Sequence, residues 1–132
     1  MSTNAERTLD KITASVNNDA ALLHHGRYVH LTFLLGLGAE DFLITIVKGR
    51  ISEVRPRTLA TDSGVFSIRA SLQHWQKFWL AVPPRDYQDL FSMLPKQYAI
   101  IDGDLLPLMQ NLQYFKDVLA CGRETEAKNS SA

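Results

Sequence analysis

The sequence has a single cysteine and no excess of either charge, and each absence excludes a class of protein. Cys121 stands alone among 132 residues, so no internal disulfide can form and a reducing compartment is expected. The 14 basic side chains are balanced by 14 acidic ones. This balance argues against a nucleic-acid partner, because such proteins usually present a basic face.

Long apolar runs are also missing. No stretch approaches the roughly eighteen residues of a membrane span, so stable membrane insertion is not expected. The first ten residues are polar and mixed in charge, unlike a signal peptide. We therefore expect a cytoplasmic location.

What the chain does have is enough apolar material for one core. Hydrophobic residues make up 45% of it, and a chain of this size buries about two-thirds of its surface on folding. A single domain is expected over residues 1–121, with a helical N-terminal segment at 3–25 and a sheet with further helices at 27–120. Residues 122–132 lack apolar periodicity and are predicted to form a disordered tail.

Helical periodicity opens the chain. Leu9, Ile12 and Val16 recur at helical spacing after Ala5, which indicates one apolar stripe. Turn-forming residues at 17–19 interrupt the helix. A short continuation at 20–25 is expected to end at Gly26 in a left-handed conformation.

The middle of the chain alternates with the period of strands. Strands are predicted at 28–35, 42–47, 51–57, 65–70 and 97–101, with a loop at 36–40. Lys48-Gly49 suits a tight hairpin turn, and Pro56 indicates an edge strand because proline cannot donate to a ladder. The first three strands are therefore expected to form an antiparallel meander.

Helices are predicted between and after the later strands. Ser71 is a good N-cap for a helix over 72–82, which Pro83 ends. A shorter helix is expected at 86–94 and a last one at 105–119, with Pro107 in its first turn. The predicted fold is α+β, in the order α-β-β-β-crossover-β-α-α-β-α. One five-stranded, mostly antiparallel sheet is covered by helices on one face.

Polar constellations give no strong catalytic or metal signal. His24 and His25 are adjacent and point about 100° apart on a helix, so they do not suit one metal ion. Asp102 and Asp104 fit a turn and a helix cap. Cys121 has no histidine nearby in sequence. We predict no catalytic residue, no metal and no cofactor.

Aromatic residues are the most informative feature. Trp75, Phe78, Trp79, Tyr87 and Phe91 fall within seventeen positions. Each is more simply a core residue, but as a group they suit the wall of a ligand pocket.

Three arginines accompany the third and fourth strands. Arg55, Arg57 and Arg69 fit either a solvated edge or a clamp for an anionic head group at a cavity mouth.

From about residue 27 to 120 the chain resembles the sterol carrier protein 2-like family. Three segments carry the resemblance: DFLITIVKGRISEV (41–54), VFSIRASLQHWQKFW (65–79) and YAIIDGDLLPLMQNLQYFKDVL (98–119). The last is the most specific, because a strand ends in a Gly-Asp step, at Gly103-Asp104, and runs into the closing helix. The resemblance implies a five-stranded sheet and a hydrophobic tunnel for sterols, fatty acids or acyl-CoA.

The sequence departs from the eukaryotic carriers at two places. It ends in NSSA rather than a peroxisomal signal of the Ser-Lys-Leu type, which favours a bacterial origin. Pro83-Pro84 and Pro95 punctuate a stretch that does not align with the family, so the resemblance implies neither the shape of the tunnel wall nor the ligand.

The leading hypothesis is a non-catalytic carrier whose partner is a hydrophobic small molecule or lipid. The alternatives are a small isomerase or hydratase that uses Asp102, His30 or His74, and an accessory protein that pairs with itself or another protein. The residues predicted to contact the ligand are Phe66, Ile68, Trp75, Phe78, Trp79, Phe91, Leu108, Leu112 and Phe115.

Overall fold

The computed structural model describes residues 4–58, 64–80 and 82–123. Its α-helices are α1 (Asn4–Asn17), α2 (Ala20–His25), α3 (Leu72–Phe78), α4 (Leu106–Gln110) and α5 (Leu112–Ala120). A 3-10 helix, η1, spans Leu90–Met93. The strands are β1 (His30–Leu37), β2 (Glu40–Val47), β3 (Arg50–Pro56), β4 (Phe66–Ala70) and β5 (Ala99–Gly103).

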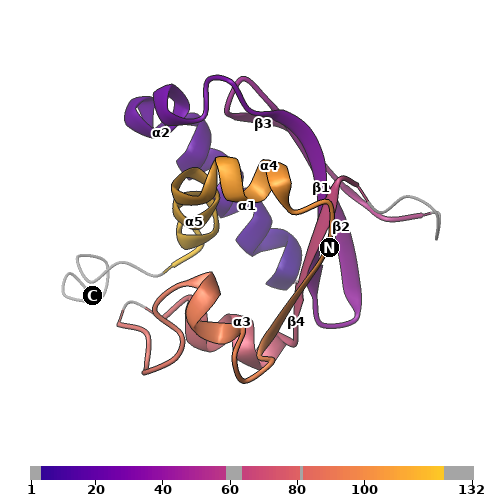
Figure 1. Cartoon of the computed structure of the whole chain (residues 1–132), viewed down its shortest axis with the longest axis vertical. Helices are drawn as coiled ribbons and strands as arrows, with labels where there is room; N and C mark the ends of the chain where they lie inside the picture. Colours follow the sequence, from indigo (N-terminus) through magenta and orange to yellow (C-terminus); the bar gives the residue numbers. More distant parts are fainter. Residues whose placement is uncertain (1–3, 59–63, 81, 124–132) are drawn as a thin grey trace.

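The five strands form one sheet in the order β3-β2-β1-β4-β5. The central pair, β1 and β4, is parallel, and the other neighbouring pairs are antiparallel. The helices lie on one side of this sheet (Figure 1). The predicted α+β class, with a mostly antiparallel sheet, is confirmed, and the Pro56 strand is at the edge as expected.

The core lies between the sheet and the helices. On β1 the side chains of Phe33, Leu35 and Leu37 belong to this core, and all three are fully buried. Alternation along the strand turns Leu34 to the other face of the sheet, where it pairs with Leu43 of β2. Both of these leucines are also buried, so the sheet has buried apolar side chains on both faces near its centre.

Helix α2 ends where predicted, at Gly26, but for a different reason. Gly26 follows α2 as expected, but its φ is −98° and the left-handed prediction is wrong. A Cβ on Gly26 would overlap the ring of Tyr114. Glycine therefore suits this position because α5 approaches the backbone closely, and not because of its conformational freedom.

Both hairpin turns are tight. Lys48 and Gly49 have φ of 53° and 82°, the paired positive values of a type I′ turn, so the predicted hairpin is confirmed. The predicted loop at 36–40 is too long. Strand β1 continues to Leu37, and two residues connect it to β2, with Gly38 at φ 67°.

Three of the later elements are shorter than predicted. Helix α3 ends at Phe78, whose carbonyl accepts a hydrogen bond from Arg123 Nε at 2.9 Å. The predicted helix at 86–94 reduces to η1, since Asp86 has a φ of 74°. The last helix breaks at Asn111, with φ −124° and ψ 35°, into α4 and α5.

Strand β5 begins two residues later than predicted. Gln97 has a φ of 60°, and the amide of Tyr98 donates to Met93 O at 2.9 Å. Gln97 and Tyr98 therefore belong to the preceding turn, and pairing with β4 begins at Ala99.

The described part of the chain includes two residues of the predicted tail, Gly122 and Arg123. Gly122 is buried, and Arg123 Nη2 donates to Gln88 O at 3.0 Å in addition to its bond with Phe78. The rest of the predicted tail, 124–132, lies outside the described residues.

Candidate functional site

The position of α1 on the sheet creates the candidate site. Its apolar stripe of Leu9, Ile12 and Val16 is fully buried. The Asn17 side chain joins the end of α1 to β3: its Nδ2 donates to Ile51 O at 3.0 Å, and Ile51 N donates to its Oδ1 at 2.9 Å. An edge strand has unpaired backbone groups, and Asn17 satisfies two of them.

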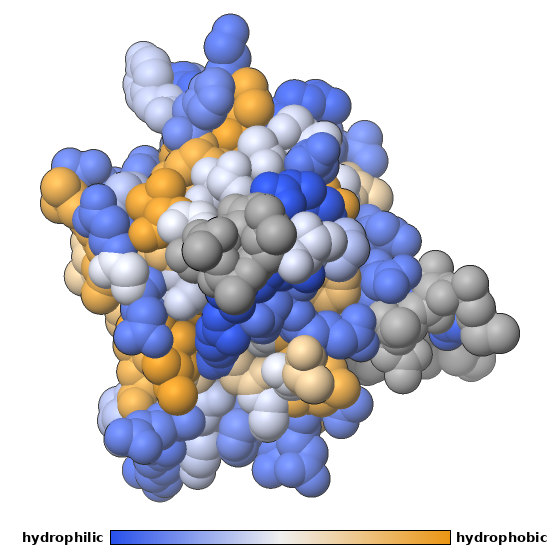
Figure 2. Space-filling view, turned by 90° about the vertical axis from the view of Figure 1, so that its right-hand side faces the viewer, coloured by the Kyte–Doolittle hydropathy of each residue, from blue (hydrophilic) through white to orange (hydrophobic). Residues whose placement is uncertain are grey.

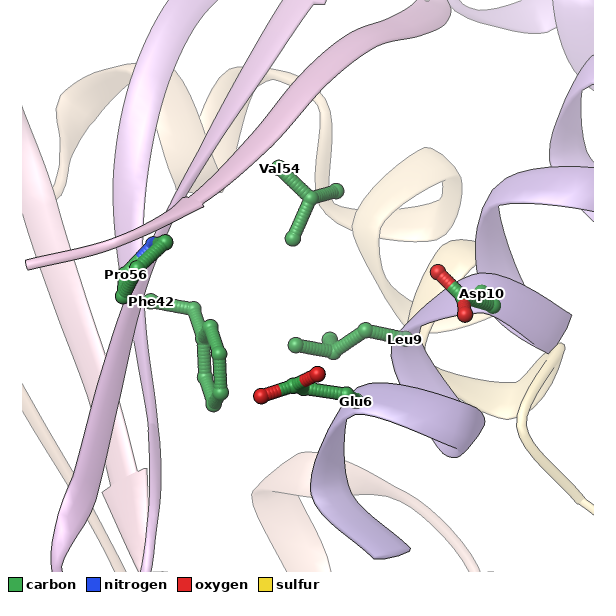
Figure 3. A pocket seen from close by; sticks show the side chains of 6 residues that line it. All are labelled: Glu6, Leu9, Asp10, Phe42, Val54 and Pro56. Atoms are coloured by element: carbon green, nitrogen blue, oxygen red, sulfur yellow. The ribbon is translucent and has the colours of Figure 1, made fainter. Parts of the chain in front are cut away.

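Nearer the N-terminus of α1, the helix and the sheet leave a pocket of about 320 Å³. Leu9 and Glu6 point from α1 toward Phe42 of β2, while Val54 extends from β3 on another side (Figure 3). Pro56 and Asp10 complete the lining. The pocket thus lies between the two layers of the fold, at the β2–β3 side of the sheet.

The pocket has an apolar floor and a polar rim. Leu9 and Phe42 are 1% and 4% exposed and belong to the core, so the floor is continuous with the interior. Glu6 and Asp10 are exposed on α1 and bring carboxylates to the helical rim. Such a pocket accommodates an apolar group whose polar end stays in water, and its volume falls at the lower end of the range for ligand pockets.

None of the nine predicted ligand-contacting residues lines this pocket. Seven of them are buried in the core, where their aromatic members belong to two clusters. In the first, the Phe33 and Phe66 rings stack with centroids 5.3 Å apart. Phe115 meets both edge-on, at 5.6 and 5.3 Å. Ile68 and Leu108 are also fully buried in this core.

The second cluster contains the two tryptophans. Trp75 and Trp79 stack at 4.9 Å, and Phe78 packs edge-on against Trp75 at 5.5 Å. Trp75 Nε1 donates to Gly36 O and Trp79 Nε1 donates to Leu119 O, both at 2.8 Å. Both indole N–H groups are thus engaged by the backbone, which fixes the rings in place.

The remaining predicted residues are only partly buried. Leu112 begins α5, and the ring of Phe91 lies 5.5 Å from Lys116 Nζ. Trp79 also lines a second hollow, of about 360 Å³, with Arg7 and Lys11 of α1. Contact between these nine residues and a ligand stays a prediction.

Sequence reasoning missed the pocket itself. Leu9, Phe42 and Pro56 were recognised only as parts of a helix stripe, a strand and an edge. Nothing in their spacing indicates that α1 lies against β2 and β3. The only related signal is Pro56, which indicates an edge strand but not a pocket beside it.

The groups needed for the enzyme interpretation are poorly placed. Asp102 and His30 are exposed. His74 is half-buried, and its Nδ1 lies 2.8 Å from Tyr87 Oη.

Burial, followed by the nearby carboxylates Asp19 and Asp117, raises the pKa of the Cys121 thiol to about 11. A protonated thiol is a poor nucleophile.

Neither a metal site nor a membrane-spanning helix is found among the described residues. Across residues 4–58, 64–80 and 82–123, no group of three His, Cys, Asp or Glu side chains is placed to hold a metal ion. Within these residues, no helix has both the length and the apolar character needed to cross a membrane.

The fold matches solved structures, although the sequence does not match any protein-family model or curated protein. A crystal structure of sterol carrier protein 2 superposes with a TM-score of 0.69 at 13% identity, over 90% of this chain and 95% of that one. A conserved hypothetical protein of Thermus thermophilus, described as a possible sterol carrier protein, gives 0.64 at 14% identity, over 94% and 92%. A UbiJ-SCP2 ubiquinone synthesis protein gives 0.59 at 15% identity, over 92% and 95%. The chain has the sterol carrier protein 2 fold, as its sequence resemblance led us to expect.

Proposed function

We propose that this chain is a non-catalytic carrier for a lipid-like molecule, which it takes up between the sheet and the helices. The observation that carries the proposal is the pocket between α1 and the β2–β3 edge, with an apolar floor that continues into the core. The ligand classes we favour are fatty acids, acyl-CoA and sterol-like lipids. The solved structures described as sterol carrier proteins support this choice.

Apolar contact is sufficient for such binding. Each methylene that leaves water contributes about 0.8 kcal/mol, so several methylenes against Leu9, Phe42 and Val54 give useful affinity without a specific polar partner. Phe33 and Phe115 fill the interior. A long chain therefore needs more room than the pocket offers, and movement of α1 away from the sheet would provide it.

The carrier function is tested by a substitution that places a large side chain in the pocket. Val54 is half-buried and faces the pocket, whereas its neighbour Glu53 is exposed. Val54→Trp is expected to weaken binding of a fluorescent fatty acid at least tenfold, since the indole occupies the space that the acyl chain needs. Glu53→Trp adds the same ring to the same strand outside the pocket and is the matched control.

Two results would contradict the proposal. One is the absence of saturable binding by the unmodified protein at micromolar concentration. The other is equal affinity in the Val54→Trp and Glu53→Trp variants, provided both keep the circular dichroism spectrum of the parent.

A further inference from the structure

A separate hollow, of about 460 Å³, lies where the outer face of the sheet meets the start of α3. Its lining includes Arg69, Ser71, His74, Gln97, Tyr98 and Ile100. It shares no lining residue with the pocket beside α1. Figure 2 looks onto the right-hand side of the molecule in Figure 1, where orange apolar residues interrupt a mainly blue surface.

Arg69 brings a guanidinium group to the hollow. Alternation along β4 buries Ile68 in the core and turns Arg69 outward, beside Ile100 of β5. Arg69 Nη1 donates to Asp41 Oδ2 at 3.0 Å, and Arg57 Nη1 donates to the same oxygen at 3.1 Å. One carboxylate oxygen thus accepts hydrogen bonds from two guanidinium groups.

The Arg69 guanidinium is still accessible to a ligand. Its side chain is 42% exposed, and the bond to Asp41 uses one of its five N–H donors. The stem lies close over Gly36, where a Cβ would come within 2.7 Å of Arg69 Cγ. Glycine at this position leaves room for the arginine to lie flat along the sheet.

Stacked rings provide a flat wall. His74 Nδ1 and Tyr87 Oη are 2.8 Å apart, and the Tyr98 ring stacks on both side chains. Its centroid lies 4.5 Å from that of His74 and 5.0 Å from that of Tyr87, with interplanar angles of 25° and 3°. Rings held in this way lose little freedom when a further ring packs against them.

We propose that this hollow binds a planar aromatic carboxylate. The ring lies against Tyr98, His74 and the side chain of Ile100, which is 52% exposed, and the carboxylate pairs with Arg69. The planar fork of a guanidinium matches a carboxylate in geometry as well as charge. One accessible guanidinium suits a monoanion better than a polyphosphate. The lining residues carry no carboxylate, and the neighbouring carboxylate of Asp41 is itself paired with Arg57 and Arg69.

The test uses 2-naphthoate as the probe, with calorimetric titration as the measurement. Neutral 2-naphthamide controls for the charge, and cyclohexanecarboxylate controls for the flat ring. Naphthoate is expected to bind at least tenfold more tightly than either. A saturating fluorescent fatty acid should not displace naphthoate, because the two sites are separate.

Variants identify the residues responsible. Arg69→Gln should remove the preference for naphthoate over naphthamide, whereas Arg85→Gln, which changes an exposed arginine outside the hollow, should keep it. Tyr98→Leu should weaken both aromatic probes while the preference for the acid remains. Because Tyr98→Leu leaves the Arg69–Asp41 pair in place, its effect reports on the ring wall and not on the loss of that pair.

The proposal fails if naphthoate and naphthamide bind the unmodified protein equally or not at all. It also fails if Arg69→Gln and Arg85→Gln reduce naphthoate binding to the same extent. Displacement of naphthoate by the fatty acid would place both ligands in one site and contradict the existence of a second binding site.

Discussion

At the scale of single residues, Cys121 illustrates how packing controls reactivity. It follows α5, where burial raises the pKa of its thiol to about 11. An ordinary cysteine has a pKa of about 8.5. The unfolded chain therefore releases this proton first as the pH rises. The stability that the protonated thiol contributes is fully present below about pH 8.5 and is lost as the pH rises toward 11.

This shift predicts slow alkylation of the folded protein. Only the thiolate reacts, so at about pH 8 iodoacetamide should modify folded Cys121 about a hundredfold more slowly than the same chain unfolded in guanidinium chloride. The rate should increase up to about pH 11. Equal rates for folded and unfolded chains would contradict the burial of this thiol.

Single residues also mark where the sequence is informative and where it is not. Ser71 was predicted as an N-cap, and its Oγ accepts from His74 N at 3.2 Å, because a cap is a local arrangement of neighbouring residues. The reason for Gly26 could not be predicted, since Tyr114, the ring that excludes a Cβ there, is distant in sequence.

At the scale of elements, the Asn17 side chain attaches the C-terminal end of α1 to β3. Two hydrogen bonds, one donated and one accepted by the Asn17 side chain, join it to the backbone of Ile51, which is 4% exposed. Removal of this amide would leave a buried N–H and a buried carbonyl without these partners. Such groups cost about 1–3 kcal/mol when unsatisfied.

Asn17→Ala is therefore expected to lower the free energy of unfolding by about 1–3 kcal/mol, as measured by urea denaturation. Asn18→Ala is the matched control. Asn18 is exposed and its side chain bonds within α1, from Nδ2 to Ala14 O at 2.8 Å. Equal losses in the two variants would mean that Asn17 does not join the helix to the strand.

Element boundaries were predicted where a local signal exists. The period-two segments gave five strands, and the positive φ of Lys48 and Gly49 follows from the hairpin that their sequence predicts. The break at Asn111 was missed because apolar spacing continues across it. Apolar spacing alone does not distinguish one continuous helix from two consecutive helices. The break separates residues of the predicted stripe, because Met109 on α4 is exposed whereas Phe115 on α5 is buried.

At the scale of the whole molecule, the two faces of the sheet have different chemistry. The inner face meets the helices through an aromatic core and opens beside α1. The outer face carries the Asp41–Arg57–Arg69 cluster and the hollow lined by Arg69, His74 and Tyr98. The layer architecture follows from strand and helix periods and could be predicted. The pocket could not, because it depends on how α1 packs across β2 and β3.

The most direct test of the carrier function is native mass spectrometry of the purified protein, before and after incubation with a long-chain fatty acid. A carrier should give a complex that contains one lipid molecule, either already present after purification or formed on incubation. A spectrum that contains only the mass of the polypeptide under both conditions would contradict the carrier function.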